Sequence, residues 1–209
     1  MESSSAEAFS LVMFPVDQHG IPTPPAEELD PFLDAAARCF ARYGVRRTSV
    51  QDVANELGVN RATVYRQVGT IDQQIRLLIA RDLHRLVAEL PASLAGKSGP
   101  RAVVELMATI IGFASEHPVL TKVLQDEPEL IGPFLVSDLP EVITRVTAAI
   151  APLLDAAMAA NQIATRDPGL LAESLVRLGI TLILAPPPGD LDAFLAEVLV
   201  PTLKPSPKR

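Results

Sequence analysis

Two short helical patterns joined by a glycine turn constrain the fold of this chain more than any other feature. Residues 49–57 place their apolar side chains on one helical face, and residues 61–68 do the same. Between them lies a short connection that contains Gly58 and ends at Asn60, a residue that favours a helix N-cap. Helices joined so tightly cannot lie antiparallel and must cross at a steep angle. The pattern therefore predicts a helix-turn-helix unit.

The rest of the chain after residue 30 is also typical of helices. Apolar residues recur with helical spacing, Pro and Gly mark the boundaries, and no stretch alternates as a strand would. Pro152 falls inside one pattern and predicts a kink or a break there. The fold class expected is all-α. The further predicted helices are 31–43, 72–90, 100–114, 118–126, 130–136, 140–161, 168–185 and 189–203.

The composition excludes several classes of protein. Apolar residues make up 48% of the chain, which excludes disorder throughout. The single cysteine, Cys39, excludes a disulfide framework and paired-cysteine zinc sites, and we interpret it as a small core or helix-surface side chain and not as a reactive nucleophile. No apolar run reaches the roughly 18 residues of a membrane span, and the apolar stretch 8–14 lacks the basic flank of a signal peptide. We therefore expect a soluble, cytoplasmic protein without a membrane partner.

The formal net charge of −7 hides an uneven distribution. Residues 1–30 hold six acids and no base, whereas residues 31–85 hold nine arginines against five acids, a local charge of +4. Residues 86–209 are acidic again, with nine bases and fourteen acids. A basic block between acidic flanks suggests a local footprint for phosphate, although a solvated helix face with scattered arginines would give the same count.

Residues 32–79 resemble the N-terminal DNA-binding domain of the TetR/AcrR family of bacterial transcriptional regulators. Three motifs carry the resemblance in order and spacing: F-x-x-x-G at 40–44, T-S-V-x-x-V-A at 48–54 and G-V-x-x-x-T-V-Y at 58–65. Residues 86–209 resemble the family's effector-binding and dimerisation domain more loosely. The resemblance implies an N-terminal three-helix helix-turn-helix domain followed by a helical domain. The predicted divisions are a flexible arm 1–30, a DNA-binding domain 31–75, a ligand-binding and dimerisation domain 76–203, and a disordered tail 204–209.

Seven residues are the candidate DNA contacts. The first turns of a recognition helix enter a major groove about 12 Å wide, so they need donors or small side chains, and Val64 and Val68 face back into the core. Other side chains near the groove can bond phosphate oxygens, which fixes register without reading sequence. A core role is the alternative for Tyr65. The candidates are Arg61, Ala62, Thr63 and Arg66 for the groove, and Arg47, Thr48 and Tyr65 for phosphate.

The chain departs from the family pattern at two positions, where the family usually has Phe and, three residues later, Lys. Val68 and Ile71 stand there. The missing lysine removes a phosphate contact and predicts weaker electrostatic anchoring, offset by Arg46 and Arg47.

The helix predicted at 168–185 is apolar nearly all round in its second half. Such a helix needs a neighbour beyond its own core, so we expect a two-fold homodimer with a four-helix bundle that includes residues 140–161. A central core helix in a monomer is the alternative. Met107 and Phe113 are weak candidates for an effector pocket, since apolar helical stripes usually only pack.

No cofactor or metal site is expected. His117 precedes Pro118 and is interpreted as a helix-entry residue. The acids Asp126, Glu127 and Glu129 have no His or Cys nearby and are interpreted as a solvated turn.

The leading functional hypothesis is a dimeric repressor that binds a palindromic double-stranded DNA operator and releases it when an unidentified small-molecule effector binds. The release mechanism is implied by the family. Two alternatives are an enzyme that contains a degenerate helix-turn-helix and a helical interaction module that has lost DNA binding. The sequence contains no GxGxxG, P-loop, GxSxG or HExxH motif, and its three histidines are scattered, so a non-enzyme is expected.

Overall fold

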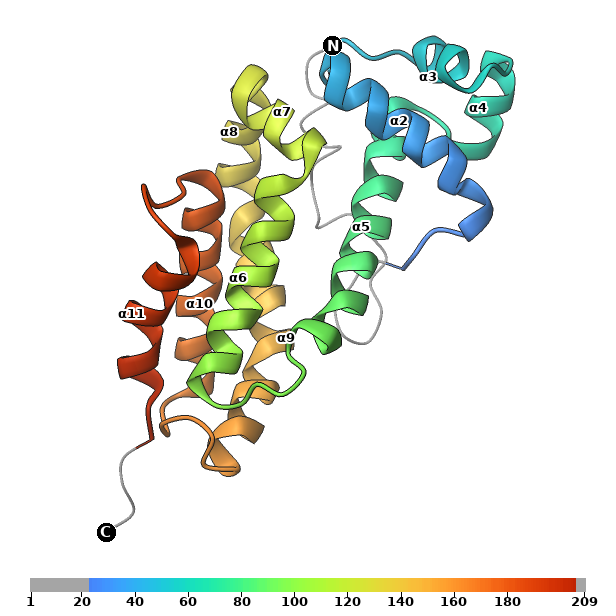
Figure 1. The fold of residues 1–209 in the computed structure, drawn as a ribbon. Helices are drawn as coiled ribbons and strands as arrows, with labels where there is room; N and C mark the ends of the chain where they lie inside the picture. The colour runs from blue at the N-terminus through green and yellow to red at the C-terminus, as the bar shows by residue number, and fades with distance from the viewer. Residues whose placement is uncertain (1–22, 206–209) are drawn as a thin grey trace. The chain divides into compact units, whose positions relative to one another are not determined.

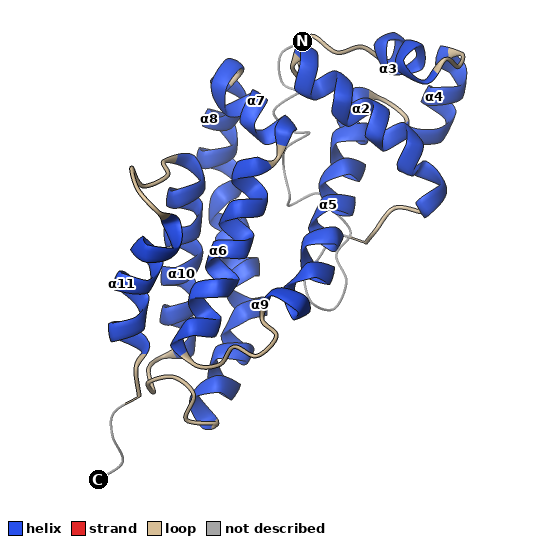
Figure 2. Cartoon of the chain, viewed as in Figure 1, coloured by secondary structure: helices blue, strands red, loops and turns tan. Residues whose placement is uncertain are grey.

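The computed structural model describes residues 23–205, and this part of the chain is helical without any strand (Figures 1 and 2). The all-α prediction is confirmed. Most of the predicted arm and tail lies outside the described residues. Short helices are η2 (Glu27–Leu29), η3 (Pro128–Leu130), α8 (Ile131–Pro133) and η4 (Phe134–Asp138). The longer helices are α2 (Asp30–Tyr43), α3 (Val50–Leu57), α4 (Arg61–Val68), α5 (Ile71–Ser93), α6 (Pro100–Glu116), α7 (Pro118–Asp126), α9 (Leu139–Ala159), α10 (Pro168–Leu184) and α11 (Leu191–Leu203).

The helix-turn-helix forms for local reasons. At the start of α3, Ser49 and Asp52 form a reciprocal capping box, which satisfies two backbone N–H groups. Gly58 ends α3 with φ 68°, a left-handed conformation that favours glycine. Two residues later the Asn60 side chain accepts the N–H of Ala62 at 2.8 Å and begins α4. The predicted turn is confirmed residue by residue.

The described residues divide into two compact units by their contacts. Unit 1 contains the chain up to residue 85 together with 116–142, and unit 2 contains 86–115 together with 143 onward. In unit 1, α2 packs on both α3 and α7, around a core that includes Phe40 and Val123. Residues 116–142 thus pack with the N-terminal helices, a grouping that no sequence pattern indicates. The domain boundaries predicted at 75 and 76 stay predictions.

Unit 2 has a core built from α6, α9, α10 and α11. Of the two outcomes predicted at Pro152, the break into two helices is wrong, because α9 continues through the proline, and the kink stays a prediction. Ile150 before the proline and Leu154 after it pack into the same core cluster, which holds both halves of the helix in place.

The stretch Pro128–Ala159 is long and apolar enough, by length and composition alone, to cross a membrane. Its best 18-residue window has a mean hydropathy of 1.5 and is 22% buried. Arg145 and Asp155 interrupt α9, so this stretch is not an uninterrupted apolar run, and the expectation that no such run reaches the length of a membrane span stays a prediction.

Candidate nucleic-acid interface

The recognition helix α4 turns one face to the core of unit 1 and the other to solvent. Val64 is fully buried and Val68 is 2% exposed, and both belong to the cluster that contains Val53. Among the other residues of α4, Arg61, Ala62 and Arg66 are exposed, and Thr63 is half-buried. The structure therefore leaves all four groove candidates accessible on one helix.

The three phosphate candidates differ in their surroundings. Tyr65 is 57% exposed, so the core alternative for this ring is wrong. Arg47 is also exposed. Thr48, in contrast, is buried, and its hydroxyl donates to the Gly44 carbonyl at 2.6 Å. While that bond holds, the hydroxyl has no proton for a phosphate oxygen, and the predicted contact by Thr48 stays a prediction.

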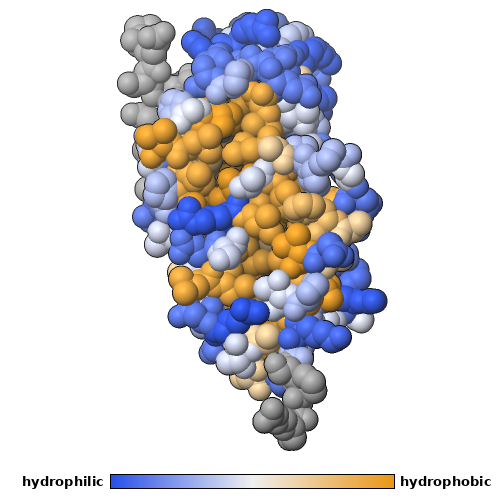
Figure 3. Space-filling view, turned by 90° about the vertical axis from the view of Figure 1, so that its left-hand side faces the viewer, coloured by the Kyte–Doolittle hydropathy of each residue, from blue (hydrophilic) through white to orange (hydrophobic). Residues whose placement is uncertain are grey.

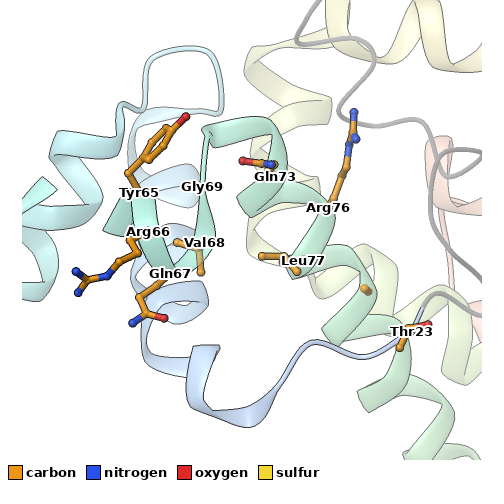
Figure 4. Close-up of a pocket in the computed structure, with 10 residues that line it drawn as sticks. Thr23, Tyr65, Arg66, Gln67, Val68, Gly69, Gln73, Arg76 and Leu77 are labelled. Carbon is orange, nitrogen blue, oxygen red and sulfur yellow. The ribbon is translucent and has the colours of Figure 1, made fainter. Parts of the chain in front are cut away.

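A groove of about 580 Å³ lies between α4 and α5, inside unit 1. Its lining includes Tyr65, Val68 and Leu77 (Figure 4). In this view Val68 and Leu77 lie between the two helices, whereas the guanidinium group of Arg66 points away from α5. The arginine is thus directed outward, where a ligand as large as duplex DNA can reach it.

Salt bridges within the protein determine which arginines of the basic block, residues 31–85, are available to contact DNA. Arg38 and Arg42 both pair with Glu56, at 2.7 and 3.5 Å, and so tie α2 to α3. Arg46 pairs with Glu129 at 2.9 Å. Arg61 and Arg66, however, form no salt bridge with any residue in the range 23–205. Two arginines that have no salt-bridge partner among the described residues therefore lie exposed on α4.

Sequence reasoning missed a buried acid beside this interface. Glu127 is 4% exposed, so its assignment to a solvated turn is wrong. Its carboxylate accepts the backbone N–H of Val45 at 2.7 Å and that of Arg46 at 3.0 Å. Glu129 is half-exposed, in keeping with the prediction. No local signal could have found the Glu127 contact, because the bonded residues are 82 and 81 positions apart.

A second buried network joins α5 to α7. His117 begins α7 as predicted, since its Nδ1 accepts the N–H of Leu120. Its Nε2 lies 2.9 Å from Asp82 Oδ2, so the neutral ring donates to that carboxylate. Asp82 also accepts from Arg81 at 3.0 Å. Burial alone raises the pKa of Asp82, but the hydrogen bonds from His117 and Arg81 outweigh it and hold the pKa below its ordinary value.

The effector candidates lie in unit 2. Met107 is 7% exposed and packs in the core, with its methyl group against Gly179, while Phe113 is half-buried. An open groove of about 730 Å³ lies elsewhere in unit 2, with walls that include Arg101, Glu105 and Glu197. Met107 and Phe113 do not line it. Their effector role stays a prediction. Among residues 23–205, no group of three or more His, Cys, Asp or Glu could hold a metal ion.

Comparison with known proteins agrees with this geometry. Residues 32–73 match the family described as bacterial regulatory proteins, tetR family. The chain is 26% identical over 178 residues to the HTH-type transcriptional regulator AlkX of Mycobacterium tuberculosis, a match that covers 82% of this chain and 83% of AlkX. It is 31% identical over 123 residues to the HTH-type transcriptional repressor DrrR1 of Streptomyces coeruleorubidus, which covers 58% of this chain and 44% of DrrR1.

The fold also matches solved structures. PfmR, a TetR family transcriptional regulator from Thermus thermophilus, aligns with a TM-score of 0.57 at 20% identity, over 88% of this chain and 100% of PfmR. At that identity the likeness concerns the fold alone.

Proposed function

We propose that this chain, which belongs to the tetR family of bacterial regulatory proteins, is a repressor that binds a palindromic operator as a homodimer and releases it when a small molecule binds. One observation carries the proposal: Arg61 and Arg66 are exposed on α4 and form no salt bridge with any residue that the structure describes. Two guanidinium groups beside Ala62 and Thr63 suit the donor and size requirements of a major groove. The similarity to DrrR1, which is a transcriptional repressor by name, supports the choice of repressor.

The dimer is proposed from symmetry and from an exposed apolar surface. Two recognition helices must reach half-sites about 34 to 36 Å apart, and a two-fold dimer meets that requirement. Figure 3 looks onto the side where α10 and α11 lie in Figure 1, and hydrophobic residues gather on that side. Among the described residues, the large apolar side chains that unit 2 exposes are Val87, Val146, Leu153, Leu170, Leu184, Phe194 and Val198.

The exposed apolar surface of unit 2 also affects where in the cell we place the protein. Isolated apolar residues on a protein surface are ordinary, but a cluster of them marks an interaction site. We assign the apolar stretch 128–159 to packing between subunits and not to a membrane. A protein that acts on an operator must reach the chromosome, so the proposed location is the cytoplasm.

Leu170→Glu is expected to weaken self-association by at least about 100-fold, because the dimer would bury an unpaired carboxylate. Leu170 is 66% exposed in the single chain, so the monomer itself should remain folded. Sedimentation over a range of concentrations measures the effect. Gln162→Glu adds the same charge at an exposed loop residue and should sediment like the wild type. Equal self-association of both variants would contradict this placement of the interface.

Arg61→Ala is expected to weaken binding to the specific operator by about 1 to 3 kcal/mol, because a bidentate contact to a base edge is lost. Binding to random DNA should weaken much less. Fluorescence anisotropy on the two duplexes measures the difference. Equal weakening on both would mean that Arg61 contacts only phosphate.

Selection of binding sites from a random DNA pool tests the proposed function as a whole. The wild-type protein should enrich a two-fold symmetric motif whose half-sites lie about one helical turn apart. Recovery of a motif without symmetry would contradict the dimeric mode, and recovery of no motif would contradict operator binding. The relatives and the fold are those of transcriptional regulators, so nothing favours the enzyme alternative.

A further inference from the structure

The loop between α2 and α3, residues 44–49, receives a buried carboxylate from a distant part of the chain. Glu127 follows α7 and places its carboxylate against this loop, where it accepts the N–H groups of Val45 and Arg46 at 2.7 and 3.0 Å. Hydrogen bonds to a charged acceptor are stronger than neutral ones, and a buried N–H without a partner is costly. Glu127 therefore satisfies two donors that the loop does not satisfy itself.

Gly44 makes this close approach possible. Its φ is +89°, in the left-handed region, and a Cβ at this position would lie 2.8 Å from Glu127 Oε1. The Gly44 carbonyl in turn accepts the Thr48 hydroxyl at 2.6 Å. The carboxylate, the glycine and the threonine thus fix the course of the chain through Arg46 and Arg47.

We propose that Glu127 is a positioning residue for DNA binding: it holds the 44–49 loop in the conformation in which Arg47 meets phosphate. This inference rests on the proposed function and deepens it. Through Glu127, the segment that contains α7 and η3 controls the loop, although it is more than 80 positions away in sequence. A rearrangement of that segment would therefore loosen the phosphate contacts without any change in α4.

Two charge-matched variants test the proposal. Both Glu127→Gln and Glu129→Gln remove one negative charge, which by long-range electrostatics alone should strengthen DNA binding. Glu129→Gln also releases the exposed Arg46 side chain, so its affinity for the selected operator should equal or exceed that of the wild type. Glu127→Gln should instead bind about 10-fold more weakly, because the amide keeps one acceptor oxygen and turns an NH2 group toward the second donor.

The salt dependence separates positioning from loss of folded protein. If the loop no longer holds its phosphate contact, the slope of log K against log salt should fall by about 1 in Glu127→Gln. A merely destabilised protein would lose active fraction and keep the wild-type slope. Operator affinity and slope equal to those of Glu129→Gln would overturn the proposal.

Amide exchange of the wild-type protein gives a second test that does not need the variant to fold. Binding of the operator should slow exchange at the amides of Val45 and Arg46. The reason is that DNA favours the loop conformation in which Glu127 accepts both N–H groups. Unchanged exchange at both amides in the complex would overturn the positioning role. If the wild-type protein selects no DNA sequence at all, the proposed function fails instead, so the two failures can be told apart.

Discussion

Phe40→Ala is expected to lower the free energy of unfolding by about 3 to 5 kcal/mol, because a fully buried aromatic ring leaves a cavity when it is truncated. Phe40 is 0% exposed and belongs to the cluster that joins α2, α3, α4, α5 and α7. Chemical denaturation of the full chain measures the change. Operator binding should fall with it, since the same cluster holds α4 in place.

Tyr43→Ala provides the comparison for Phe40. Tyr43 lies on the same helix, is 42% exposed, and contacts only the Arg42 guanidinium among the interactions described. Its truncation should cost less than about 1 kcal/mol. A similar loss of stability in Phe40→Ala and Tyr43→Ala would contradict the packing of the Phe40 face of α2 against the core.

Asp82→Asn is expected to lower the free energy of unfolding by about 3 kcal/mol at neutral pH, because Arg81 is buried and would lose a charged partner. The Arg81 side chain is only 9% exposed. Asp34→Asn removes another partner of Arg81, one that lies 2.7 Å away but is 49% exposed. That control should cost less than about 1 kcal/mol, since water screens exposed pairs. Equal losses of stability in Asp82→Asn and Asp34→Asn would contradict the difference in burial between the two carboxylates.

The difference in stability between the wild type and Asp82→Asn should also depend on pH. The folded pKa of Asp82 is lowered by its partners, so the unfolded chain binds more protons than the folded chain as the medium is acidified. The stability that Asp82 contributes is therefore fully present above its unfolded pKa of about 3.9 and is lost as pH falls through the folded value. The difference between wild type and Asp82→Asn should shrink below about pH 4. Denaturation at a series of pH values measures it, and a constant difference would contradict the lowered pKa.

The sequence predicted those features that depend on local chemistry. The Ser49–Asp52 capping box, the Gly58 turn and the Asn60 cap each involve residues that lie close together in the sequence, so their spacing is visible in the chain itself. The exposed face of α4 followed from helical periodicity in the same way. The candidate recognition surface could therefore be located from the sequence without knowledge of any tertiary contact.

The features that the sequence did not predict all depend on distant residues. The burial of Glu127 requires α7 to pack on α2, and the contact between His117 and Asp82 requires α5 beside α7. Burial of Thr48 depends on the loop that Glu127 fixes. An acid in a Pro-flanked turn is usually solvated, and nothing local distinguishes Glu127 from Glu129.

The count of charges in residues 31–85 correctly gave a positive balance for the basic block. It did not identify which of its arginines have charge available for phosphate. Within the basic block, Glu56 pairs with Arg38 and Arg42, and acids of α2 and α5 pair with Arg81 and Arg85. These pairs stabilise the unit and leave less charge for phosphate. What distinguishes a DNA-binding surface from a solvated helix face is the location of the unpaired charge on α4, and only the structure reveals it.

Operator binding against salt tests the central claim most directly. Anisotropy of the selected operator and of a scrambled duplex should be measured with the wild-type protein over a range of salt concentrations. We expect log K to fall linearly with log salt on both duplexes, and the operator to be preferred by at least about 1,000-fold at physiological salt. Equal affinity for the two duplexes, or no binding at low salt, would contradict the assignment of this chain as a sequence-specific regulator.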